Sequence, residues 1–149
     1  MTPLALWVLL GLFVLRVVGQ ILLGLDVLQP GGLVPPWNEW QSGLVPYPWL
    51  LVSQVLIVVT LAKASVDVSR GRGFLARPNR MLGRGLVLVG CVYAFGMGIR
   101  YWLQGGLSIP IVFHWVLAGY LLVFGAFHLR SARAWYSAQS TPQRGSPWS

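Results

Sequence analysis

Apolar runs of roughly 20 residues alternate with shorter polar stretches along the chain. A helix needs about 20 mainly apolar residues to cross a bilayer core about 30 Å thick. Backbone groups in lipid must form hydrogen bonds within their own segment, so such runs predict helices. The runs do not alternate between apolar and polar residues, as a membrane β-barrel requires. The predicted spans are residues 4–25, 47–64, 85–103 and 109–129.

These spans predict an all-α fold: an integral membrane four-helix bundle in which successive helices run up, down, up and down. Residues 1–131 would form the transmembrane domain, and residues 132–149 a polar, disordered tail. The first span has no basic residue ahead of it and no small-residue cleavage site after it. We therefore expect it to be retained rather than removed as a signal peptide.

Composition agrees with a membrane protein. The chain is 56% hydrophobic and only 9% charged, whereas soluble domains carry roughly a quarter charged residues. The net charge of +8 is compatible with nucleic acid or an anionic membrane surface. The basic residues flank apolar runs and no nucleic-acid-binding motif accompanies them, so the expected partner is the lipid bilayer and not nucleic acid.

The loops differ sharply in charge, which predicts the orientation. The stretches 26–46 and 104–108 contain no Lys or Arg. Cytoplasmic loops carry the excess of basic residues, so we expect both termini and the loop between spans two and three to be cytoplasmic. The expected location is the cell (inner) membrane, crossed several times. The basic residues on the cytoplasmic side are Lys63, Arg70, Arg72, Arg77, Arg80, Arg84, Arg130, Arg133 and Arg144.

Polar side chains within the spans gather in the outer half of the predicted bundle. Inserting a charged side chain deep into a bilayer costs about 2.5–3.5 kcal/mol, so each such side chain is expected to have a compensating partner or a functional role. Turned inward, these groups would line a pocket about 5–15 Å below the outer surface, suited to a lipid-like or anionic group. Asp26 or Glu39 is expected to pair with Arg100 or Arg16. The predicted ligand-binding residues are Arg16, Gln20, Gln54, Tyr93, Arg100 and His114.

A purely structural role is the alternative for the same residues. Arg16 would then join the helices through Gln20 and Gln54, and Arg100 would extend to the interface. Small residues provide a second packing signal. Gly90, Ala94 and Gly98 recur every four residues, which predicts close helix packing along this stripe.

Two histidines on the fourth span carry a further hypothesis. His114 and His128 are fourteen residues apart, close to four helical turns, so they share a face about 21 Å apart. This spacing resembles that of membrane b-type cytochromes, in which two histidines on one helix each ligate one of two stacked haems. The resemblance implies haem-based electron transfer. That arrangement needs two further histidines, which a homodimer would supply; Met97 or Met81 is an alternative ligand.

The sequence lacks the motifs of several common kinds of catalytic and binding site. It has no phosphate-binding loop, nucleophile elbow or cysteine pair, and its counts of Cys and His exclude a clustered metal site. The leading hypothesis is a non-catalytic accessory protein or complex subunit, associating with other membrane subunits or as a homodimer. The alternatives are the haem protein with His114 and His128, and an enzyme acting on a lipid or quinone with His114 as acid or base.

Overall fold

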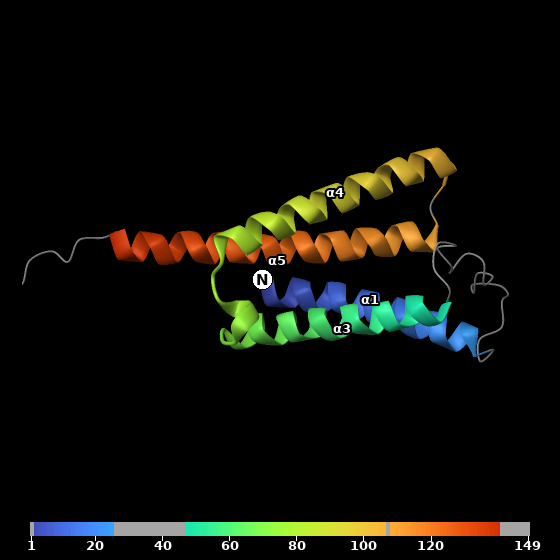
Figure 1. Cartoon of the computed structure of the whole chain (residues 1–149), viewed down its shortest axis with the longest axis horizontal. Coiled ribbons are helices and arrows are strands. Elements are labelled where there is room, and N and C mark those ends of the chain that lie inside the picture. The colour runs from blue at the N-terminus through green and yellow to red at the C-terminus, as the bar shows by residue number, and fades with distance from the viewer. Residues whose placement is uncertain (1, 26–46, 107, 141–149) are drawn as a thin grey trace, which may run out of the picture.

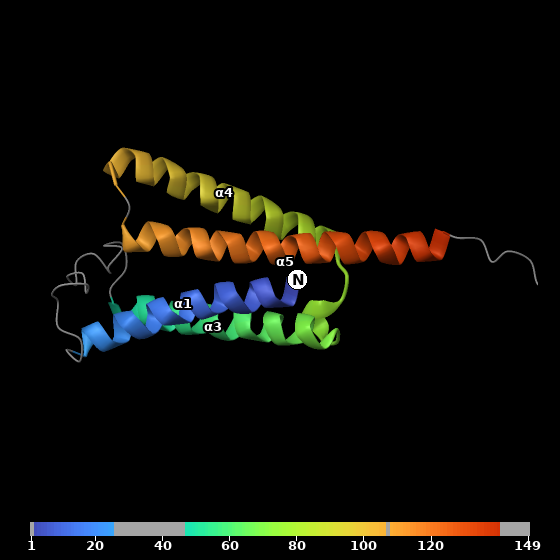
Figure 2. The same ribbon diagram turned by 180° about the vertical axis from the view of Figure 1, so that it is seen from behind.

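Four long helices and one short 3₁₀ helix make up the part of the chain that the structure describes. The structure is a computed structural model, and it describes residues 2–25, 47–106 and 108–140. Within these ranges there is no β-strand. The helices lie side by side with their long axes roughly aligned (Figure 1; Figure 2). They are α1 (Thr2–Gly24), α3 (Tyr47–Arg70), η1 (Phe74–Ala76), α4 (Arg80–Gln104) and α5 (Ile109–Ser140).

The predicted all-helical class and the four apolar helices are confirmed. Each long helix has the length and composition to cross a membrane. Their ends differ from the predicted spans: α4 begins at Arg80 instead of 85, and α5 continues to Ser140 instead of 129. Hydropathy indicates only the part of a helix that would lie in the hydrocarbon core of a membrane. The helix itself can continue into polar residues that favour a helical backbone. Residues 132–140 of the predicted disordered tail are therefore helical, and residues 141–149 lie outside the described residues.

The ends of α4 follow local sequence signals. Asn79 precedes the helix, and its side-chain Oδ1 accepts a hydrogen bond from the backbone N–H of Leu82 at 2.9 Å. This cap satisfies one of the backbone donors left free in a first helical turn. Gly105 follows the last helical residue with φ 68°, a left-handed conformation that glycine adopts without a steric penalty.

The buried core lies where α1, α3 and α5 meet. The principal packing pairs are α4 with α5, α1 with α5, α1 with α3, and α3 with η1. The Tyr120 hydroxyl donates to the Leu61 carbonyl at 2.6 Å and lies 2.8 Å from Ser65 Oγ. The hydroxyls are therefore satisfied inside an apolar environment. The core cluster comprises Leu6, Leu10, Leu61, Ala64, Val68, Tyr120 and Phe124.

Helices α4 and α5 lie closest at one end and diverge towards the other (Figure 1). At the close end, a Cβ added to Gly83 would lie 3.0 Å from the Gly125 carbonyl oxygen, and one on Gly125 would lie 2.9 Å from the Gly83 oxygen. Gly90, farther along α4, would meet the Leu122 side chain at 3.0 Å. Close packing therefore depends on Gly83, Gly90 and Gly125.

The predicted small-residue stripe is correct only in part. Gly90 lies in the α4–α5 contact, but a Cβ on Gly98 would have no atom within 4 Å. At the middle position of the stripe, the Ala94 carbonyl accepts a hydrogen bond from Trp115 Nε1 at 3.2 Å. A bulky indole therefore stands opposite this turn of α4, and the two helices separate beyond it.

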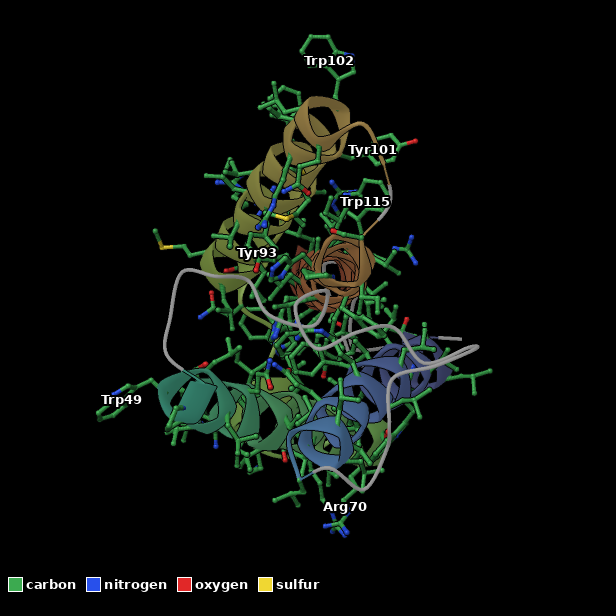
Figure 3. All side chains as sticks on the ribbon, turned by 90° about the vertical axis from the view of Figure 1, so that its right-hand side faces the viewer. Trp49, Arg70, Tyr93, Tyr101, Trp102 and Trp115 are labelled. Carbon is green, nitrogen blue, oxygen red and sulfur yellow. The ribbon has the colours of Figure 1, made fainter. Side chains whose placement is uncertain are left out.

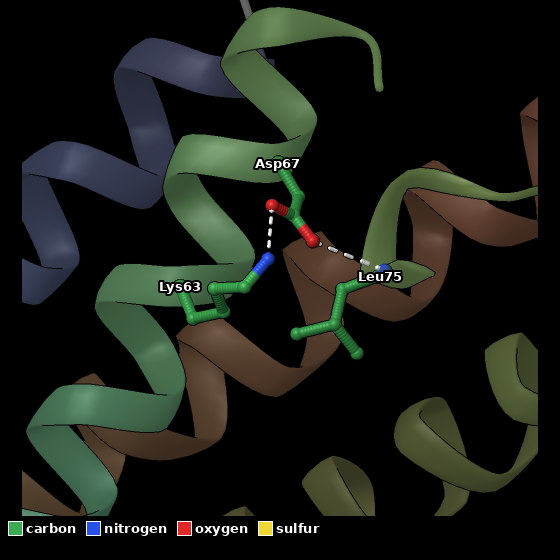
Figure 4. A network of polar contacts seen from close by, with 3 residues as sticks. All are labelled: Lys63, Asp67 and Leu75. Carbon is green, nitrogen blue, oxygen red and sulfur yellow. Dashed lines mark hydrogen bonds and ion pairs between the residues drawn. The ribbon is translucent and has the colours of Figure 1, made fainter. Parts of the chain in front are cut away.

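The connection from α3 to α4 folds back onto Asp67 (Figure 4). Asp67 Oδ2 accepts a hydrogen bond from the backbone N–H of Leu75 at 3.2 Å, and Oδ1 lies 2.5 Å from Lys63 Nζ. Gly73 has φ 119°, and a Cβ there would overlap the Asp67 carboxylate. Glycine is needed at this position both for the backbone angle and for the close approach.

Candidate functional site

A cavity opens between the helices at the end where α4 and α5 diverge. Its volume is about 350 Å³, within the range of small-molecule sites. All four long helices contribute to it. From the residue positions, its polar groups lie about 6–17 Å along the helix axes from the nearest helix ends. This polar cavity is lined by Phe13, Arg16, Leu50, Ser53, Gln54, Ile57, Tyr93, Met97, Arg100, His114 and Leu117.

Arg16 is the most deeply buried charged group of the polar cavity. The residue is only 5% exposed, and its Nε has no hydrogen-bond partner among the described residues. Its guanidinium carbon lies 5.6 Å from the centre of the Phe113 ring, in range of a cation–π interaction. That interaction does not replace an anionic partner for a buried charge.

Two glutamine amides connect α1 and α3 beside Arg16. Gln54 Nε2 donates to Gln20 Oε1 at 3.0 Å. Gln54 is 3% exposed and its Oε1 has no partner among the described residues. Gln20 is fully buried and does not line the cavity, whereas its partner Gln54 does. The amide of Gln54 is the one available to a ligand.

On the opposite wall, Tyr93 of α4 meets His114 of α5. The Tyr93 hydroxyl lies 2.8 Å from His114 Nδ1, and the rings are in edge contact with centres 5.3 Å apart. Figure 3 shows Tyr93 on the side of α4 that faces α5. Met97 and Arg100 follow on the same face of α4, four and seven residues later.

Of the described residues that line the cavity, two are cationic and none is acidic. Asp67 is the one acidic residue of the described ranges, and it pairs with Lys63. It lies thirteen residues beyond Gln54 on α3, about 20 Å along the helix axis. The predicted pairing of Asp26 or Glu39 with the arginines falls on residues that lie outside the described ones.

The structure brings five of the six predicted site residues to one cavity, with Gln20 as their neighbour. Their role in binding stays a prediction. The sequence interpretation did not include the apolar part of the wall, although helical spacing from the polar residues would have indicated it. Phe13 precedes Arg16 by three residues, and Leu117 follows His114 by three.

The two histidines of the haem hypothesis lie in different surroundings. His114 lines the polar cavity together with Met97. His128 is fully buried, with its ring in edge contact with Phe124 and Phe127 at centre distances of 4.7 and 5.4 Å. Met81, the other possible ligand, is exposed. The described residues contain no group of three or more His, Cys, Asp or Glu side chains that could hold a metal ion. Haem binding stays a prediction.

The fold and the cavity together define an all-helical bundle with four helices of membrane-spanning length and a cationic cavity near one end. No protein-family model, no curated protein and no solved structure matches the chain.

Proposed function

We propose that this is a non-catalytic four-helix membrane protein whose polar cavity binds the anionic group of a lipid-like molecule. It would act as an accessory protein or a subunit, together with other membrane subunits or a second copy of itself. The helices alternate in direction, with both termini and the α3–α4 connection in the cytoplasm. The polar cavity then lies in the outer half of the inner membrane.

The burial of Arg16 is the observation that carries this proposal. The residue is 5% exposed and lines the same cavity as Arg100, and none of the described residues that line this cavity is acidic. Burying an uncompensated charge is costly. An anionic ligand would compensate it, and Tyr93, His114 and Gln54 would add hydrogen bonds to the oxygens of that ligand.

Aromatic and basic side chains support the orientation. Trp49 and Trp102 are 69% and 79% exposed near the cavity end and point away from the bundle (Figure 3). Trp and Tyr concentrate at membrane–water interfaces. The Arg residues of the α3–α4 connection and of the end of α5 belong to the opposite end of the bundle, where the positive-inside rule puts the cytoplasm.

Native mass spectrometry of the protein, purified in an uncharged detergent, tests the proposal. We expect an anionic lipid to remain bound to the wild type and to be lost from Arg16→Gln. The matched control is Arg84→Gln, which removes an exposed arginine from the other end of α4. Equal retention of anionic lipid by Arg16→Gln and the wild type would contradict the proposal.

A catalytic role is the second candidate, favoured by the contact between Tyr93 and His114. A tyrosine that holds one ring nitrogen fixes the tautomer and leaves Nε2 to exchange a proton with a lipid or quinone. The test is turnover of defined lipids and quinones by the wild type and by His114→Ala. Activity that survives His114→Ala would rule out this histidine as acid or base.

A further inference from the structure

An apolar groove continues from the polar cavity towards the middle of the bundle. Its volume is about 310 Å³. It shares Ile57 and Leu117 with the polar cavity, so the two spaces adjoin there. The groove is lined by Leu56, Ile57, Thr60, Leu61, Leu117 and Leu121.

The groove runs between α3 and α5, and no residue of α4 lines it. These two helices are not among the principal packing pairs of the described residues. Figure 3, which views the cavity end, shows α3 and α4 separated, with α1 and α5 completing the bundle. Leu56, which lines the groove, is 63% exposed, so the groove opens to the side of the bundle, which in a membrane is the direction from which a lipid enters.

The chemistry of the groove suits a hydrocarbon chain. Five of its six lining residues are aliphatic. The sixth, Thr60, has its hydroxyl bound to the Leu56 carbonyl at 2.8 Å, so it offers its methyl group without an unsatisfied donor. The groove therefore provides no polar group that a ligand would have to satisfy.

The polar cavity and the apolar groove follow one another along the helices, as the headgroup and the acyl chain follow one another in a lipid. Gln54 and His114 belong to the polar cavity, and Leu61 and Leu121 lie seven residues beyond each of them, about 10 Å along the helices. This direction leads away from the cavity end and into the bundle. In the proposed orientation, it is the direction of an acyl chain of the outer leaflet.

We infer that the ligand is an anionic lipid, with its charged headgroup between Arg16 and Arg100 and one acyl chain in the apolar groove. This inference rests on the proposed function and specifies its ligand class. Arg16 and Gln54 are each at least 95% buried and have an unpartnered polar atom, Nε and Oε1. The headgroup oxygens would supply an acceptor for the former, and a headgroup hydroxyl a donor for the latter.

Three soluble probes distinguish the contributions of the headgroup and of the acyl chain to binding. They are lysophosphatidylglycerol, lysophosphatidylcholine with the same chain, and glycerol phosphate. Each is titrated against the full-length protein in an uncharged detergent and followed by native mass spectrometry. We expect lysophosphatidylglycerol to bind at least ten-fold more tightly than either other probe. Arg16→Gln should remove this preference, because it removes the buried charge.

Two variants fill the groove, Leu121→Trp and Thr60→Trp, so that one remains if the other fails to fold. Each should weaken lysophosphatidylglycerol at least ten-fold. The matched control is Leu88→Trp, which places the same indole on an exposed position of α4 outside both spaces. Melting temperatures close to that of the wild type verify that the variants are folded.

The outcomes distinguish this inference from the proposed function. If both groove variants bind lysophosphatidylglycerol like the wild type while Arg16→Gln does not, the chain lies elsewhere, and the inference fails although the headgroup site stands. If no probe binds, both fail. If only the double variant Asp26→Asn, Glu39→Gln binds the probe, the cavity is occupied by the protein's own carboxylates, and the inference is overturned.

Discussion

The Tyr93 hydroxyl lies 2.8 Å from Nδ1 of His114 and joins α4 to α5 where the two helices diverge. Tyr93→Phe keeps the ring and removes this hydrogen bond. We expect a loss of about 0.5–1.5 kcal/mol in the free energy of unfolding, the usual net contribution of one such bond. Thermal unfolding in detergent measures it. Tyr101→Phe, on an exposed position of the same helix, should leave the melting temperature unchanged.

A substitution of Arg16 can distinguish a ligand-binding role of this residue from a purely structural one. A single charged side chain deep in a bilayer costs about 2.5–3.5 kcal/mol, so replacing it by an apolar residue of similar size should stabilise the protein. If Arg16 is retained for a ligand, Arg16→Met in ligand-free protein should unfold at a higher temperature than the wild type and bind less anionic lipid. A lower melting temperature together with unchanged lipid binding would identify Arg16 as a structural link between helices.

Gly125 tests the close contact between α4 and α5. The methyl group of Gly125→Ala would meet Val87 Cγ2 at 2.8 Å and the Gly83 carbonyl at 2.9 Å. Overpacking of this kind costs about 1–3 kcal/mol, so the melting temperature should fall. The control is Gly96→Ala, which has no atom within 4 Å of the added Cβ and should change stability by less than about 1 kcal/mol. Equal effects of the two changes would contradict the packing described.

Asp67 should control the order of the α3–α4 connection. Asp67→Ala removes the acceptor for the Leu75 N–H and should increase protease cleavage near residues 71–79. Lys63→Ala removes the ion pair but keeps that acceptor. Because the Lys63 side chain is 59% exposed, its ion pair is screened by water and contributes little. We therefore expect Lys63→Ala to be cleaved like the wild type, and comparable cleavage of the two variants would contradict this.

The membrane orientation can be tested with single cysteines in a Cys91→Ser background. A membrane-impermeant maleimide added to intact cells should label Gly106→Cys, which lies between α4 and α5. It should not label Arg72→Cys, which lies between α3 and α4, until the membrane is permeabilised. The reverse pattern would overturn the orientation and place the polar cavity in the inner half of the membrane.

Two pairs of residues show which features could be predicted from the sequence and which could not. Gly83 and Gly98 are both glycines of α4, yet a Cβ on Gly83 would contact α5 while one on Gly98 would contact nothing. Small-residue spacing indicates that a helix can pack closely, but the side chains opposite decide where. In the same way, Gln20 and Gln54 were both predicted to bind a ligand, and only Gln54 reaches the cavity wall.

The sequence by itself determined the four apolar helices. It also determined that most of their polar residues lie at a similar position along the long axis of the bundle. The reason is local: lipid cannot satisfy backbone polar groups, so a run of sufficient length and apolarity forms a helix whatever its neighbours are. Only the tertiary structure decided how each helix is rotated about its axis and where α3 and α4 part. That rotation depends on contacts between distant residues, such as Gly83 with Gly125 and Tyr93 with His114. The contact between the two glycines holds α4 and α5 together at one end, and the cavity lies at the other end, where the helices diverge.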